Sequence, residues 1–128
     1  MGIYAVAAVG TGAAMGAWLR WSFGILLNPV FPTLPFRTLM ANLTGGHLVG
    51  VAVEYFHHNT MLPPEARLFA ITGFLGRLTT FSTFSAETVT LLLREQYGWA
   101  FVIVLSHLAG SLAMTMLGIM TIKWLTQP

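Results

Sequence analysis

Four long apolar runs follow one another along the chain, separated by short stretches that are polar or contain proline. A helix that crosses a bilayer needs roughly 20 mostly apolar residues. Each run approaches or exceeds that length, so the pattern predicts four membrane-spanning helices in a single domain covering residues 1–128. The predicted spans are residues 3–27, 38–56, 68–93 and 99–125.

The connections between the runs contain residues that end helices. Prolines occur throughout the segment from Asn28 to Pro35, and two more follow at Pro63 and Pro64. Proline lacks a backbone donor and clashes with the preceding helical turn. The last connection is the short stretch 94–98. Amphipathic aromatic residues lie near the predicted ends, as is typical of membrane interfaces: Trp18, Trp21, Tyr55, Tyr97, Trp99 and Trp124.

The third run differs from the others because polar residues lie in its middle. Residues 73–85 contain two glycines, five hydroxyl residues, one arginine and three phenylalanines. Polar groups at membrane depth are costly and commonly functional, and irregular backbone is tolerated there only where protein or a water-filled cavity covers it. The glycines and the pair Thr79-Thr80 therefore predict a helix that breaks in mid-membrane, and they favour an ion or solute path over a lipid anchor.

Composition supports an all-α integral membrane protein. Only 8% of the residues are charged and the mean hydropathy is +0.73, whereas soluble domains carry about 25% charged residues. The chain has no cysteine, which excludes disulfides and thiolate metal sites. The net charge of +2 comes from scattered residues and forms no patch for nucleic acid.

Basic residues give almost no preference for one orientation in the membrane. Arg67 and Lys123 fall on the side of the predicted termini, and Arg37, Arg94 and Arg20 fall on the other side. Since Lys/Arg bias in short loops sets orientation, we predict a dual-topology chain that forms an antiparallel homodimer. A weakly biased chain that is oriented by its partners remains the alternative.

Glycine pairs in the first two spans suit close helix packing. Gly12 and Gly16 are four residues apart, as are Gly46 and Gly50. This spacing lets helix backbones approach each other. The contact lies either within one subunit or between two copies, and the sequence leaves both open.

Two spans carry polar residues at helical spacing. At about 100° per residue, one face of the second span presents Thr38, Asn42, Gly45 and Gly46, and one stripe of the fourth presents His107, Ser111, Thr115 and Gly118. Hydrogen bonds between helices, or from hydroxyls to their own helix carbonyls, explain such stripes as well as a transport path does. For His107 a neutral hydrogen-bonding role is favoured over a metal ligand or proton carrier.

The third span offers an aromatic pair and one carboxylate. Phe81 and Phe84 are three residues apart and share a face. The edge of an aromatic ring is positive and its face negative, so ring edges would favour an anion and ring faces a cation. Glu87 is either a proton carrier or a residue near the rim with a basic partner.

With these motifs assembled, the chain resembles the Fluc (CrcB-type) fluoride channels of bacteria over nearly its whole length. The resemblance rests on residues 12–20, on Asn42-Leu43-Thr44-Gly45, and on residues 73–84. The run Thr79-Thr80-Phe81-Ser82-Thr83-Phe84 is the most specific part.

The resemblance implies a dual-topology homodimer in the bacterial inner membrane, with two antiparallel pores that pass fluoride. It implies a structural sodium ion at the dimer centre, held by the carbonyls of Gly76 and Thr79, and no organic cofactor. It also implies that the fluoride pore is lined by Asn42, Phe81, Phe84, Ser82, Thr83, Ser111 and Thr115. Thr38 and His107 are expected to form a polar cluster beside it.

Arg77 departs from the resemblance, because the family usually has glycine at this position. Arginine is strained in the positive-φ conformations that glycine allows. We expect the side chain either to extend into a vestibule, where it would attract anions, or to weaken the sodium site.

The sequence thus predicts a passive fluoride channel that is not an enzyme and that protects a cell against fluoride. A small dual-topology antiporter driven by protons is the first alternative, and it would require Glu87. A structural subunit of a larger membrane complex and a cation channel are the others.

Overall fold

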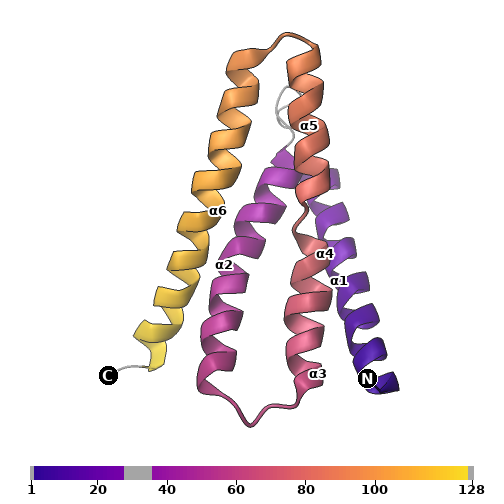
Figure 1. Ribbon diagram of the computed structural model, residues 1–128, viewed down its shortest axis with the longest axis vertical. Helices are drawn as coiled ribbons and strands as arrows, with labels where there is room; N and C mark the ends of the chain where they lie inside the picture. The colour runs from indigo at the N-terminus through magenta and orange to yellow at the C-terminus, as the bar shows by residue number, and fades with distance from the viewer. Residues whose placement is uncertain (1, 28–35, 127–128) are drawn as a thin grey trace.

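The computed structural model describes residues 2–27 and 36–126, and all regular structure within these ranges is helical (Figure 1). Pro64 opens α3 at a position where a missing backbone donor costs nothing. The predicted connection Asn28–Pro35 lies outside the described residues. The elements in chain order are α1 (Ile3–Leu27), α2 (Phe36–His58), α3 (Pro64–Arg67), the π-helix η1 (Leu68–Leu75), α4 (Gly76–Leu78), α5 (Phe81–Leu93) and α6 (Tyr97–Thr126).

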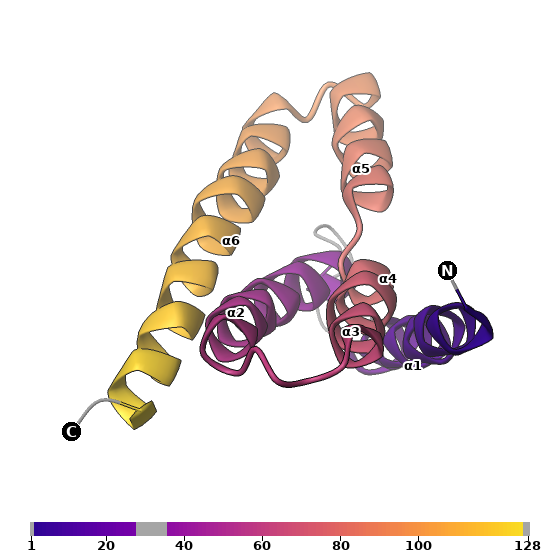
Figure 2. The same cartoon turned by 60° about the horizontal axis from the view of Figure 1, so that its bottom comes forward.

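Four long segments alternate in direction, as the four apolar runs predict, because α3, η1, α4 and α5 together make one interrupted segment. The start of α1 and the end of α6 lie at one end of the molecule with the connection between α2 and α3, and the turn before α6 lies at the other end (Figure 1). In Figure 2, α1, α2 and the first half of the interrupted segment lie together, whereas α5 leads away from them toward the start of α6.

Among the described helices, α6 alone is long and apolar enough to cross a membrane by length and composition, with a mean hydropathy of 1.9 over its best window. The interrupted segment cannot meet that criterion because its break leaves short pieces. Large apolar side chains of α6 are exposed, among them Phe101, Leu108 and Met116. The surface of α6 therefore suits lipid or a further protein chain.

Close packing of α1 against η1 depends on glycine. A Cβ atom on Gly12 would overlap the carbonyl oxygen of Phe69, and one on Gly16 would overlap that of Phe74. From the other side, a Cβ on Gly73 would lie 2.6 Å from the carbonyl oxygen of Val9. The spacing of Gly12 and Gly16 therefore serves contacts within one chain.

Glycines also allow close packing of α2 against α6. A Cβ on Gly50 would overlap the backbone of Thr115, and one on Gly118 would overlap the carbonyl oxygen of His47. Gly46 is also buried here, with the carbonyl oxygen of Ser111 3.2 Å from the place of its missing Cβ. Of the two interpretations left open by the sequence, packing within the subunit is the one observed.

The predicted break in the third span lies at Thr79 and Thr80, both in extended conformation between α4 and α5. The Thr80 hydroxyl accepts a hydrogen bond from the backbone N–H of Thr83 at 3.2 Å and so caps α5. The glycines do not form the break, since Gly76 is helical and no described glycine has a positive φ angle.

Arg77 does not adopt the positive-φ conformation in which arginine would be strained. This residue lies within α4, and among described non-glycine residues only Glu95, in the turn before α6, has a positive φ angle. The Arg77 side chain is exposed. A glycine at this position is therefore not needed for backbone conformation.

We predict that Gly16→Ala lowers the free energy of unfolding by about 1–3 kcal/mol, the usual cost of overpacking. The matched control is Gly10→Ala in the same helix, where a Cβ meets nothing within 4 Å. This control should be neutral or stabilising by up to about 1 kcal/mol, because alanine favours helix. Unfolding in detergent followed by tryptophan fluorescence measures both, and equal effects of the two substitutions would contradict the packing described.

Candidate functional site

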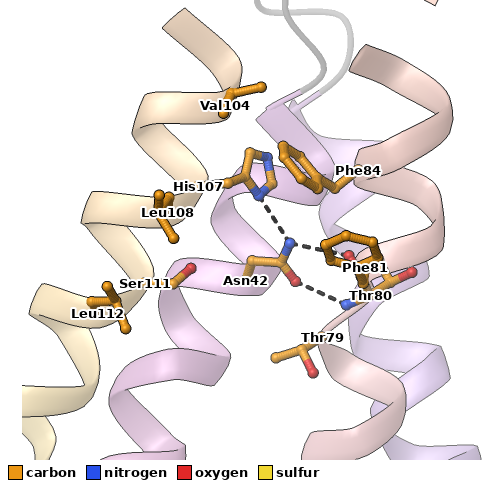
Figure 3. A pocket seen from close by; sticks show the side chains of 10 residues that line it. All are labelled: Asn42, Thr79, Thr80, Phe81, Phe84, Val104, His107, Leu108, Ser111 and Leu112. Atoms are coloured by element: carbon orange, nitrogen blue, oxygen red, sulfur yellow. Dashed lines mark hydrogen bonds between the residues drawn. The ribbon is translucent and has the colours of Figure 1, made fainter. Parts of the chain in front are cut away.

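The side-chain amide of Asn42 forms two hydrogen bonds with the backbone of Thr80 at the break, one as donor and one as acceptor. Its Oδ1 accepts a hydrogen bond from the Thr80 N–H at 2.8 Å, and its Nδ2 donates to the Thr80 carbonyl oxygen at 3.2 Å. Unpaired backbone groups are costly away from water. The side chain of α2 thus supplies the two hydrogen bonds that the broken helix cannot make for itself (Figure 3).

The same pairing changes the hydrogen bonding of Gly76. In a continuous α-helix the Thr80 N–H would donate to the carbonyl of Gly76, four residues earlier. Here it donates to Asn42 instead. Thr79 still closes the last turn, with its N–H 3.1 Å and its Oγ1 2.8 Å from the carbonyl oxygen of Leu75. The Gly76 carbonyl therefore loses its helical donor at an exposed residue.

The Asn42 amide also reaches across to α6. Its Nδ2 lies 3.0 Å from Nδ1 of His107, whose side chain is only 5% exposed. The other ring nitrogen of His107, Nε2, is buried and has no hydrogen-bond partner among the described residues. Asn42 therefore links the break to the fourth span, and both of its amide hydrogens are engaged in this structure.

A cavity of about 410 Å³ opens between α2, the break, α5 and α6 (Figure 3). Four residues predicted for the fluoride pore line it together, and His107 lies beside them. None of the ten lining residues is charged. The four predicted pore residues in this lining are Asn42, Phe81, Phe84 and Ser111.

Aromatic rings form one wall of this cavity. Phe81 and Phe84 meet edge to face, with ring centroids 5.7 Å apart and ring planes at 64°. The ring of Phe84 also lies 4.4 Å from that of His107. Phe81 is 78% exposed although it lines the cavity, so its outer face is available to lipid or to another chain.

A separate, smaller cavity of about 180 Å³ has a charged residue in its lining. Arg20 of α1 lines it with Thr38 and Thr83. Thr38 is 1% exposed, and its hydroxyl donates to Oε2 of Glu87 at 2.9 Å. Glu87 is therefore tied to α2 by this hydrogen bond rather than placed in the larger cavity.

The predicted site residues consequently separate into groups. Thr38 and His107, expected to form one polar cluster, contact different partners, Glu87 and Asn42. Thr115 does not line the larger cavity, and its hydroxyl donates to the carbonyl oxygen of Gly46 at 3.0 Å. Ser82 is exposed, with its hydroxyl 3.4 Å from that of Thr80.

Sequence reasoning missed Thr80 as the partner of Asn42. A threonine three residues before Thr83 is a recognisable N-cap pattern, and this signal could have indicated the start of α5. The contact between the Thr80 backbone and Asn42 of α2 could not be predicted from local sequence, because the two residues are 38 positions apart.

Comparison with known proteins identifies the family. A family described as "CrcB-like protein, Camphor Resistance (CrcB)" matches residues 7–119. A protein of Nitrosospira multiformis named "Fluoride-specific ion channel FluC" is 76% identical over 127 residues, which cover 99% of both chains. Proteins with the same name from Cupriavidus taiwanensis and Cupriavidus necator are 56% and 57% identical over 98% of this chain and 99% of theirs.

We predict that Asn42→Ala destabilises the protein by about 2–6 kcal/mol, because it leaves two partly buried backbone groups of Thr80 unpaired, at about 1–3 kcal/mol each. Asn59→Ala is the matched control. Its Nδ2 donates to the Tyr55 carbonyl oxygen at an exposed helix end, and its loss should change stability by no more than about 0.5 kcal/mol. Unfolding in detergent compares the two variants, and an equally small effect at both sites would refute the role given to Asn42.

Proposed function

The chain belongs to the CrcB-like protein family, and on this premise we propose that it is a fluoride-specific ion channel and not an enzyme. The observation that carries this proposal is the sequence similarity, over nearly the whole chain, to proteins named as fluoride-specific ion channels, with 76% and 56% identical residues. The cavity at the helix break supports it, because residues of the most specific motif line that cavity.

The chemistry of the cavity suits a small, strongly hydrated anion. Such an ion gives up its water only where donors or positive surfaces replace it. Ring edges of Phe81 and Phe84 are positive, and the Ser111 hydroxyl is a donor. None of the cavity's lining residues carries a full charge, and conduction needs sites weak enough for the ion to leave.

We assign the fluoride pore to Asn42, Phe81, Phe84, Ser82, Thr83, Ser111 and Thr115. Support differs among them. Asn42, Phe81, Phe84 and Ser111 share the larger cavity, and Thr83 lies in the smaller one near Arg20. In the observed conformation Asn42 contributes by fixing the wall at Thr80, and it would donate to fluoride only by releasing one of its present partners.

The functional form proposed is an antiparallel homodimer with two pores. The even distribution of basic residues supports dual topology. Phe81, which is 78% exposed beside the cavity, would be covered by the second copy. Each pore would then be completed by surfaces from both chains.

At the centre of that dimer we propose a structural sodium ion held by the carbonyls of Gly76 and Thr79. Hard cations prefer oxygen ligands. The loss of the helical donor to Gly76 leaves a carbonyl suited to this role. No group of three His, Cys, Asp or Glu side chains that could hold a metal occurs in the described part of the chain.

The biological role proposed is the export of cytoplasmic fluoride across a bacterial inner membrane. Hydrofluoric acid enters a cell in its neutral form and ionises inside. A passive channel then lets the anion leave and protects the cell. A proton-coupled antiporter remains the alternative function, for which Glu87 would be the carrier.

Fluoride efflux from liposomes that contain only this protein tests the function. We predict fast fluoride release with no imposed proton gradient and little release of chloride. Protein-free liposomes are the control. Release that appears only when a proton gradient is imposed would favour the antiporter, and no release from folded protein would favour a structural subunit.

We predict that Phe81→Ile and Phe84→Ile each slow fluoride efflux about tenfold. Each substitution removes a positive ring edge that stabilises the passing ion, and a loss of about 1.4 kcal/mol of that stabilisation slows passage by a factor of ten. The protein should stay folded, since an apolar side chain of similar size is kept. Phe101→Ile on the exposed face of α6 is the matched control. Unchanged efflux in both cavity variants would remove the rings from the mechanism.

A further inference from the structure

The orientation of the Asn42 amide is fixed by the main chain of Thr80. A backbone N–H can only donate and a backbone carbonyl can only accept. Because the Thr80 N–H lies 2.8 Å from one amide atom of Asn42 and the Thr80 carbonyl oxygen 3.2 Å from the other, the first must be Oδ1 and the second Nδ2. The choice between the two amide orientations is thus made by the helix break.

This orientation determines the proton position on His107. Nδ2 of Asn42 lies 3.0 Å from Nδ1 of the ring, and an amide nitrogen only donates. Nδ1 must therefore accept, which places the ring proton on Nε2. Nε2 is buried and has no hydrogen-bond partner among the described residues. The result is a neutral ring with a buried N–H donor that is not used within the described chain.

The position of this donor connects it with the aromatic wall. The ring of His107 lies 4.4 Å from that of Phe84, and both line the larger cavity. Figure 3 shows the His107 ring between Asn42 and Phe84. A buried donor without a partner is costly, and an anion that accepts its hydrogen would remove this cost.

We propose that Asn42 is a positioning residue that holds His107 as the Nε2–H tautomer, so that a neutral N–H donor faces a permeating anion beside Phe84. The inference rests on the proposed fluoride channel for the identity of the anion. The tautomer itself follows from the contacts of Asn42 and does not depend on the function. The arrangement supplies a donor without adding a positive charge that would trap the ion.

Nuclear magnetic resonance of the intact protein in detergent, labelled with ¹⁵N in its histidines, tests the tautomer directly. Couplings between ring nitrogens and carbon-bound protons distinguish Nε2–H from Nδ1–H. The spectrum of His107→Gln identifies the His107 signals by their loss. We expect the Nε2–H form with Nδ1 unprotonated, and an Nδ1–H or doubly protonated ring at neutral pH would overturn the proposal.

Adding sodium fluoride, with sodium chloride as the control, tests the role of the donor. We expect the Nε2 signal to shift with fluoride and not with chloride. An Nε2–H ring that does not respond to fluoride, in protein that conducts fluoride, would overturn the anion contact. Failure of the proposed function is distinguishable, because the protein would then give no fluoride efflux whichever tautomer is observed.

Two substitutions at His107 distinguish the loss of the Nε2–H donor from the loss of the contact between Nδ1 and Asn42. His107→Gln places an amide N–H near the former position of Nε2, and His107→Asn keeps a group near Nδ1 and removes that donor. We expect His107→Asn to slow fluoride efflux about tenfold relative to His107→Gln, the size of effect expected for one lost hydrogen bond to an ion. Equal efflux from the two folded variants would contradict the proposal.

Discussion

The pairing of Asn42 with the main chain of Thr80 is the interaction on which the rest of the site depends. A membrane helix cannot break without leaving backbone groups that nothing in lipid can satisfy. One primary amide offers an acceptor and donors in the geometry of a peptide group, and Asn42 places them on both polar groups of Thr80. The break is thereby stabilised, and α5 can run in a different direction from η1 and α4.

The direction taken after the break creates the cavity. Glycines allow the backbones of α1 and η1, and those of α2 and α6, to contact each other directly. Within this frame α5 starts from a threonine cap and leads away from α4 (Figure 2). Phe81 and Phe84 lie in the first turn of α5 and therefore line the space between α5 and α6. A continuous third helix would place these rings differently.

The sequence predicted the elements well, because their signals are local. Run length predicted the four long segments, and Thr79 with Thr80 predicted the place of the break. The polar stripe of the second span predicted that Thr38 and Asn42 share a face, and both contact the third segment. Contacts between distant residues were not predictable in this way. Spacing alone cannot show that Thr115 bonds to Gly46 or that Gly16 packs within its own chain, because both depend on how whole helices are placed.

Hydrogen exchange at the Thr80 amide tests the central interaction most directly. Exchange reports whether a backbone N–H is bonded and how often that bond opens. If Asn42 accepts this hydrogen, the Thr80 amide should exchange as slowly as the helical amides on either side of the break, and Asn42→Ala should make it fast. Rapid exchange at Thr80 in the unmodified protein, with its neighbours protected, would contradict the account.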